Sequence, residues 1–166
     1  TSLFIADRRA ACGIELRYKT TVGDDLSDIV AVLKTALRRA RVVILTGGLG
    51  PTIDDLTREA VAQATGHRLS RRKAALDGMI ARLVEWGRTP TTTQFRQAMI
   101  PARAEILFNP VGTAPGFSLV WKGTFLAALP GVPREMEPMV RDGVLPQLQA
   151  WMRTQKRLSA SPMIRR

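Results

Sequence analysis

A short run of consecutive apolar residues, followed at once by a glycine-rich loop, is the feature that most constrains the fold of this chain. Residues 41–46 read RVVILT, and residues 46–52 read TGGLGPT. A short, continuous run of β-branched and apolar residues is typical of a strand that is buried on both faces. The run therefore predicts a central strand of an α/β sheet, with the glycine loop at its carboxyl end.

Sequence patterns before and after this strand predict alternating helices and strands. Residues 1–13 are expected to form a helix, and residues 14–20, IELRYKT, alternate apolar and polar side chains like a half-buried strand. Asp24 or Asp25 is a candidate cap for the next helix. Further helices are predicted from Leu56 to Gly66, from a cap at Ser70 to Gly87, from Phe95 to a stop at Pro101, and from Pro133 onward.

The second half of the chain has the shorter periodicity of strands. EILF begins at Glu105, and SLVW and TFLAAL are separated only by Lys122 and Gly123, which predicts a short strand followed by a hairpin. These patterns favour a three-layer α/β/α fold, with a mixed, mostly parallel sheet and one antiparallel hairpin. We expect one domain over residues 1–152, with residues 153–166 forming a basic linker or the start of a following domain.

Composition excludes several classes of protein. The 25 Lys and Arg residues against 14 Asp and Glu give a net charge of +11, but the basic residues are scattered along the chain. Aromatic residues make up only 5% of the sequence, which disfavours a nucleic-acid-binding platform. No apolar run has the length of a membrane span and no secretory signal is visible, so a cytoplasmic protein is expected. A single cysteine and a single histidine exclude a disulfide framework and a nucleophilic triad.

The glycine loop has the position and composition of a phosphate-binding turn. Loops between a strand and a helix present backbone N–H groups to anions. Gly47, Gly48 and Gly50 permit close approach, and Thr46 and Thr52 offer hydroxyl donors. The loop is not a P-loop, because no Lys-Ser/Thr pair follows it, and it lacks the third glycine of a dinucleotide-binding fingerprint.

Two adjacent carboxylates, Asp54 and Asp55, stand at the far end of this loop. Helix capping and the helix dipole account for one acidic side chain at this position. The second carboxylate suits a divalent cation that bridges to a bound phosphate, or the orientation of an attacking water. Both aspartates are therefore candidate metal ligands and catalytic residues, although two purely structural carboxylates remain an alternative.

Two further loops combine glycines with prolines. NPVGTAPGF spans residues 109–117, and LPGVPREM spans residues 129–136. Rigid turns of this kind bring the backbone close to a ligand, although tight turns at strand ends have the same composition. The candidate ligand-binding residues in these loops are Gly112, Thr113, Gly116, Gly131 and Pro133.

The order of four motifs carries a resemblance to a known family. TGGLGPTIDDLTREA, RQAMIP, NPVGTAPGF and LPGVPREM follow one another as in the N-terminal domain of CinA (competence/damage-inducible) proteins. The resemblance covers residues 2–150 and places the chain in the molybdopterin-binding superfamily. The family has a strand ahead of its first helix, so that first strand is expected to be missing from this chain.

The resemblance implies a function as well as a fold. It implies metal-dependent hydrolysis of ADP-ribose-like diphosphates by the intact protein, with the glycines on the phosphates and a functional aspartate at the position of Asp55. Asp54 matches the extra acidic residue of the CinA-like form, and Thr57 matches its threonine. Two alternatives remain: a molybdopterin-binding role with adenylyl or metal transfer, and a non-catalytic nucleotide-binding module. Either way the expected ligand is a phosphorylated small molecule, and a homo-oligomer is a further expectation, since oligomers are common in the superfamily.

Overall fold

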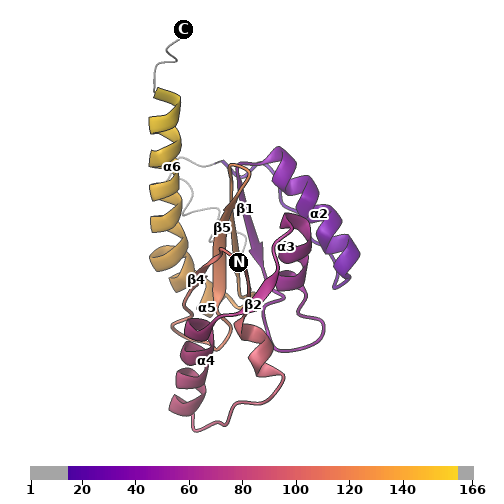
Figure 1. The fold of residues 1–166 in the computed structure, drawn as a ribbon, viewed down its shortest axis with the longest axis vertical. Coiled ribbons are helices and arrows are strands. Elements are labelled where there is room, and N and C mark those ends of the chain that lie inside the picture. Colours follow the sequence, from indigo (N-terminus) through magenta and orange to yellow (C-terminus); the bar gives the residue numbers. More distant parts are fainter. Residues whose placement is uncertain (1–14, 161–166) are drawn as a thin grey trace.

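The chain folds into three layers, with a sheet between two groups of helices (Figure 1). The computed structural model describes residues 15–160. Helices α2 (Leu26–Arg39) and α3 (Thr57–Thr65) cover one face of the sheet. Helices α5 (Pro133–Met139) and α6 (Leu145–Ala160), joined by the π-helical turn η2 (Val140–Val144), cover the other. The three-layer α/β/α prediction is confirmed.

The main sheet is mixed and has the strand order β1-β6-β5-β4. Strand β1 (Val42–Thr46) runs parallel to β6 (Thr124–Leu129). Strand β5 (Gly116–Trp121) is antiparallel both to β6 and to β4 (Glu105–Leu107). The turn between β5 and β6 consists of Lys122 and Gly123, which both have positive φ, as a two-residue hairpin requires. The predicted hairpin is therefore confirmed.

The most buried strand is β6, and this corrects the prediction that the RVVILT segment is central. All residues of β6 are buried, and they alternate between the two cores: Leu126 and Ala128 face α2 and α3, while Phe125 and Leu129 face α5 and α6. In the described part of the chain, β1 pairs only with β6 and lies at the edge of the sheet. A continuous apolar run indicates burial of the two faces of a strand, but it carries no information about its two edges.

The predicted strand at residues 14–20 is not formed over residues 15–20. These residues are exposed and have no regular secondary structure, and together with residues 21–24 they line a groove of about 740 Å³ along the open edge of β1. A strand requires a hydrogen-bonding neighbour, and none of the described strands pairs with this segment. The helix predicted for residues 1–13 lies outside the described residues.

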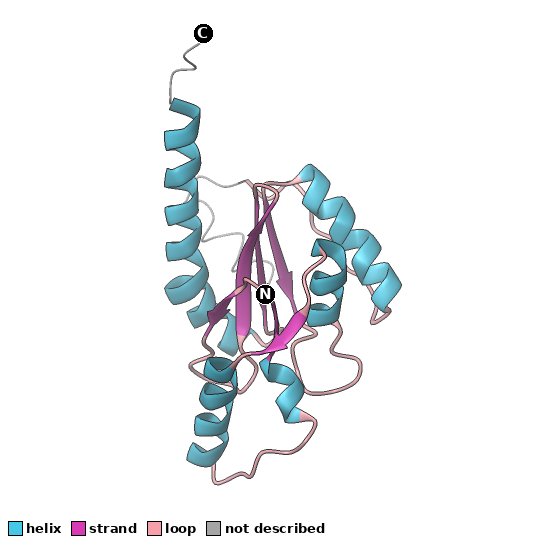
Figure 2. Ribbon diagram, viewed as in Figure 1, coloured by secondary structure: helices cyan, strands magenta, loops and turns pink. Residues whose placement is uncertain are grey.

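A small second sheet packs against helix α3, near the lower end of the main sheet in the view of Figure 2. It pairs β2 (Leu69–Arg71) with β3 (Met99–Pro101) in antiparallel fashion, with Ser70 opposite Ile100. The predicted capping role of Ser70 is therefore wrong, and helix α4 (Lys73–Glu85) begins after Arg72. The short helix predicted from Phe95 to Pro101 is the 3-10 helix η1 (Gln94–Ala98), and it ends earlier than predicted because Met99–Pro101 form strand β3.

The ends of several helices follow their local sequence. The side chain of Asp25 accepts a hydrogen bond from the backbone N–H of Asp28 at 3.0 Å and caps α2. Gly66 ends α3 with φ 73°, and Pro133 begins α5. Helix α6 continues to Ala160, so residues 153–160, predicted as part of a basic linker or of the start of a following domain, are helical. No helix within the described residues combines the length and apolarity that crossing a membrane demands.

Candidate functional site

The sheet topology brings the three glycine-containing loops to the same end of the sheet, the carboxyl end of strands β1, β4 and β6. Strands β1 and β6 are parallel, and β4 runs in the same direction as β6 because both are antiparallel to β5. The loops that follow β1, β4 and β6 therefore leave the sheet at the same end. We call residues 46–56 the glycine loop, residues 109–116 the second loop, and residues 129–133 the third loop. Ligands of open α/β sheets bind at the carboxyl end of the strands.

The glycine loop and the third loop are in direct contact. The backbone N–H of Gly47 donates to the carbonyl of Leu129 at 2.9 Å. A Cβ atom on Gly131 would lie only 3.3 Å from the Cα of Gly47. Gly47 and Gly48 have φ values of 97° and 66°, which L side chains rarely adopt. Glycine is thus favoured in this loop by backbone conformation, and a side chain at Gly131 of the third loop would be in tight contact with Gly47.

The start of α3 holds the beginning of the glycine loop in place. The Thr57 hydroxyl donates to the carbonyl of Gly47 at 2.7 Å, and the Thr57 N–H donates to the carbonyl of Gly48 at 3.1 Å. A side chain on Gly48 would collide with the Thr57 hydroxyl. Thr57 thus has a loop-holding role, which its position in the IDDLT motif alone does not reveal.

The second loop is organised around Asn109. Its Oδ1 accepts hydrogen bonds from the N–H groups of Val111 (3.0 Å) and Gly112 (2.7 Å), and its Nδ2 donates to the carbonyl of Ala114 (3.0 Å). The same Nδ2 donates to Glu135 Oε2 at 2.7 Å, which joins the second loop to the first turn of α5. Sequence analysis did not single out Asn109; an asparagine two residues before a turn is the signal that points to it.

The predicted ligand residues of the second and third loops occupy different environments. Gly112 is buried against the Glu135 carboxylate, and Thr113 is half-buried beside a small cavity of about 30 Å³. Gly116 is buried inside β5, where a Cβ atom would lie 2.6 Å from the carbonyl oxygen of Ala128. Pro133 is exposed at the start of α5. Gly116 therefore serves the packing of β5 against β6.

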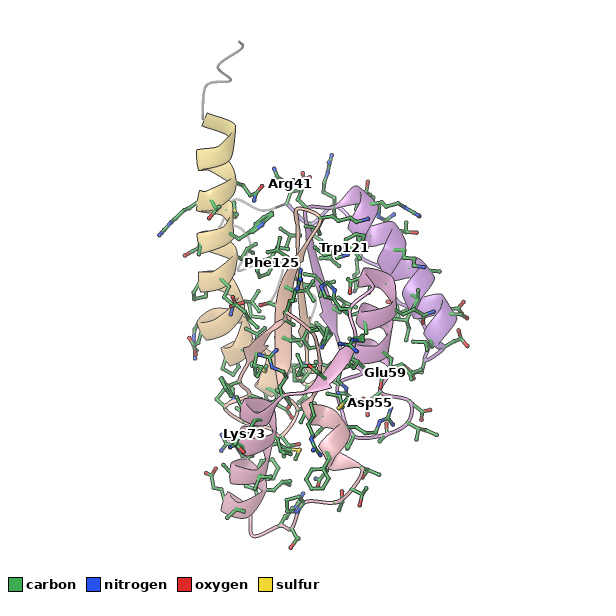
Figure 3. The ribbon with its side chains drawn as sticks, viewed as in Figure 1. Arg41, Asp55, Glu59, Lys73, Trp121 and Phe125 are labelled. Carbon is green, nitrogen blue, oxygen red and sulfur yellow. The ribbon has the colours of Figure 1, made fainter. Side chains whose placement is uncertain are left out.

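The Asp55 carboxylate is directed into the glycine loop. Its Oδ2 accepts hydrogen bonds from the Thr52 N–H at 2.8 Å and from the Thr52 hydroxyl at 2.6 Å. Partial burial by itself would raise the pKa of Asp55, but the hydrogen bonds from Thr52 and the backbone of Gly50, together with the charge of Arg58, hold that pKa below its ordinary value. Asp55 lies at the end of the sheet opposite Arg41 (Figure 3).

The Asp54 carboxylate has a different environment from that of its neighbour. Asp54 is exposed and lines the groove beside β1, together with Thr46, Gly47, Gly48 and Thr57. Asp55 does not line this groove. Of the two adjacent carboxylates, one therefore closes the loop from within and the other faces the open space.

The acidic side chains of the loop could hold a metal ion only together with phosphate oxygens of a bound ligand. Within residues 15–160, no group of three or more His, Cys, Asp and Glu side chains is arranged to hold a metal. Mg²⁺ is commonly bound by one or two carboxylates, several waters and phosphate oxygens of the substrate. Asp54 matches that donor set, whereas Asp55 does not line the groove and its Oδ2 already accepts two hydrogen bonds from Thr52.

Sequence analysis also missed Arg58, the second residue of α3, which is completely buried. Its guanidinium donates to the carbonyls of Leu49 at 2.6 Å and Gly50 at 2.9 Å. The available signal is its position, three residues before the buried Val61 and therefore on the apolar face of the helix.

Comparisons with known proteins agree with this architecture. A family described as a probable molybdopterin binding domain matches residues 1–150. The chain is 45% identical over 142 residues to a CinA-like protein of Geobacter metallireducens, covering 86% of this chain and 34% of that protein. It is 42% identical over 145 residues to a CinA-like protein of Desulfosudis oleivorans, covering 87% of this chain and 35% of that one. The chain thus spans about a third of the length of these relatives.

Solved structures extend the comparison to the fold. The crystal structure of the protein CinA from Thermoplasma acidophilum superposes with a TM-score of 0.80 and 33% identity, over 89% of this chain and 86% of that one. The molybdopterin biosynthesis enzyme MoaB from Thermus thermophilus has a TM-score of 0.56 at 22% identity, over 90% and 82% of the two chains, and shares the fold. The chain therefore belongs to the CinA family, with a domain of the probable molybdopterin-binding type.

Proposed function

We propose that the glycine loop binds the diphosphate of a nucleotide, and that the whole protein hydrolyses ADP-ribose-like diphosphates with the help of a divalent metal. The observation that carries this proposal is the position of Asp54. It is an exposed carboxylate beside the glycine loop, at a groove of about 740 Å³. A cytoplasmic location and a phosphorylated small molecule as the partner form part of the same proposal.

Different residues of the three loops have different proposed roles in binding. The positive φ angles of Gly47 and Gly48 leave the backbone free of side chains where the phosphates approach. Thr46 offers a hydroxyl donor at the same place, while the Thr52 hydroxyl already donates to Asp55. In this role the third loop would border the site, since Gly131 packs against Gly47 and Pro133 follows two residues later. Gly112 and Thr113 of the second loop are proposed to take part as well, although they line a separate small cavity of about 30 Å³ and not this groove.

Hydrolysis requires an activated water and neutralisation of the phosphate charge. A divalent metal, when bound, supplies charge neutralisation at the phosphate oxygens and lowers the pKa of water. Asp54 would hold that ion or orient the water, because its carboxylate is exposed at the groove. Asp55 would assist through its hold on Thr52, whose N–H and hydroxyl both donate to the Asp55 Oδ2.

A second candidate function is the binding of molybdopterin, with adenylyl or metal transfer. It is favoured by the description of the matching family and by the fold shared with MoaB. A pterin phosphate would use the same glycine loop, so the geometry of the loop supports both candidates equally. Extraction of the purified full-length protein for a fluorescent pterin distinguishes them.

The deciding experiment is hydrolysis of ADP-ribose by the full-length protein, with and without Mg²⁺ or Mn²⁺. We expect metal-dependent release of AMP and ribose phosphate, and a loss of at least about 100-fold in kcat for Asp54→Asn. Asp28→Asn, a change at an exposed residue in the first turn of α2, is the matched control and should leave kcat unchanged. No turnover with any of these metals, together with an extractable pterin, would overturn the hydrolase proposal in favour of the second candidate.

A further inference from the structure

A fully buried arginine lies directly behind the glycine loop. Arg58 has no exposed surface, and its Nη1 and Nη2 donate to the carbonyls of Leu49 and Gly50. Nη2 also lies 3.5 Å from the carbonyl oxygen of Asp55. Burying a charge costs several kcal/mol unless partners offset it. A buried cation used mainly to hold loop carbonyls therefore calls for a physical reason.

Charged neighbours offset part of that cost. Burial lowers the pKa of Arg58, while the carboxylates of Glu59 and Asp55 act in the opposite direction. From η1, Arg96 donates to Glu59 Oε1 at 3.2 Å and to the carbonyl of Thr52 at 3.1 Å. The glycine loop is thus held by Arg58 from the interior and by Arg96 from the surface.

The direction of the loop carbonyls is the functional consequence. A carbonyl oxygen carries partial negative charge and would repel a bound phosphate. Arg58 draws the carbonyls of Leu49 and Gly50 toward the protein interior, away from any anion on the opposite side. The Asp55 carboxylate accepts a hydrogen bond from the Thr52 N–H and so fixes that turn of the loop. The loop therefore adopts its binding conformation before a ligand arrives. Such preorganisation raises affinity because less conformational entropy is lost on binding.

We propose that Arg58 is a positioning residue for the ligand loop: its planar guanidinium holds the carbonyls of Leu49 and Gly50 inward and thereby fixes the conformation that accepts the phosphates. The inference rests on the proposed function in one respect, that this loop is the one that binds phosphate. The fork geometry is essential to it, since a lysine carries the same charge but cannot hold two carbonyls in fixed relative positions.

The test combines hydrogen exchange with ligand binding in the full-length protein. Arg58→Lys keeps the charge and removes the fork. Arg58→Met removes the buried charge with little change in volume but leaves the carbonyls of Leu49 and Gly50 without this donor, so the β5–β6 amides serve as the internal reference for a general loss of stability. Arg38→Lys, at an exposed residue of α2, is the matched control. The binding probe is inorganic pyrophosphate, measured by titration calorimetry with Mg²⁺.

We expect both Arg58 variants to accelerate amide exchange at Thr52, Asp55 and Thr57 by about tenfold or more, with the β5–β6 amides unchanged. Pyrophosphate affinity should fall by about tenfold in both, and not in the Arg38 control. Unchanged loop exchange, or rescue by Arg58→Lys to wild-type exchange and affinity, would overturn the positioning role. Faster exchange spread uniformly over the sheet would overturn it too, because it indicates a general loss of stability.

The two proposals fail in different ways. If the wild-type protein does not bind pyrophosphate, the proposed function loses its support, and the exchange pattern alone then decides the role of Arg58. If the wild-type protein binds pyrophosphate and the Arg58 variants bind equally well, the positioning role fails and the proposed function is unaffected.

Discussion

The glycine loop and the second loop have similar compositions, but the glycine loop contains one glycine, Gly47, that is required for a different physical reason from the glycines of the second loop. Gly47 has φ 97° and no atom within 4 Å of its missing side chain, so the backbone conformation alone demands glycine there, whereas a side chain on Gly48 or Gly50 would meet Thr57 or Asp55. In the second loop, the space that a side chain on Gly112 or Gly116 would need is already filled by neighbouring atoms. A glycine-rich motif therefore locates a turn without telling whether ligand approach or packing requires the glycine.

The polar anchors of the two loops differ as well. The glycine loop depends on ionised groups, the Asp55 carboxylate and the Arg58 guanidinium, each of which accepts from or donates to the backbone. The second loop depends on the neutral amide of Asn109, which bonds to backbone groups on both of its polar atoms. The glycine loop is therefore held by charged side chains, and the second loop by a neutral amide that closes the loop on itself.

The largest effect should come from Gly116→Ala. Because the new methyl group would lie 2.6 Å from the Ala128 carbonyl and 2.9 Å from Met139 Cε, strand β5 has to shift, and we expect the free energy of unfolding to fall by about 3 kcal/mol. Urea denaturation measures it. Gly78→Ala, in the middle of α4, is the control. Its methyl group would lie 3.5 Å from Phe108, an ordinary van der Waals contact, and helix propensity favours alanine over glycine. If Gly116→Ala leaves stability unchanged and weakens ligand binding, Gly116 acts in ligand binding and not in the packing of β5.

The next effect should come from Asn109→Ala, which removes the anchor of the second loop. Several buried or half-buried backbone groups lose their partner, and we expect a loss of about 2 kcal/mol in urea denaturation. Asn109→Asp retains the acceptor but places a carboxylate against Glu135, so it should recover only part of the loss. Full recovery by aspartate would mean that the contact with Glu135 contributes nothing.

A smaller change in stability is expected for Gly47→Ala. The methyl group has room, but the positive φ costs about 1 kcal/mol in an L residue. Gly23→Ala, which also has room but lacks a positive φ, is the matched control and should not destabilise the protein. If both variants are equally stable in thermal unfolding, backbone conformation is not the reason for glycine at position 47.

The smallest effect concerns the pH dependence of the Asp55 anchor. Its pKa is lower in the folded protein than in the unfolded chain, so its stabilising contribution is present above about pH 4 and is lost as pH falls through the folded pKa. Asp55→Asn should therefore be less stable than the wild type near neutral pH, and the difference should shrink in acid. Urea denaturation of both proteins over a pH series measures this difference in stability. A difference that stays constant into strong acid would contradict a stabilising role of the ionised Asp55 carboxylate.

Local sequence predicted much of the fold because local interactions decide it. The cap at Asp25, the stop at Gly66 and the turn at Lys122 and Gly123 each depend on residues that lie within a few positions of one another. Ser70 is the instructive exception among local signals. Its hydroxyl suits a helix cap, but pairing of β2 with β3, about thirty residues further along the chain, places it opposite Ile100.

The sequence by itself determined the helices, the hairpin, the turns and the order of the three loops, since hydrophobic period and turn chemistry are properties of neighbouring residues. Only the tertiary structure decided that β6 is the most buried strand, that residues 15–20 form no strand, and that Asp54 and Asp55 face different surroundings. It also decided that Arg58 is buried behind the glycine loop. The physical reason is that strand pairing, and the direction and burial of a charged side chain, depend on partners that the chain supplies only after it has folded.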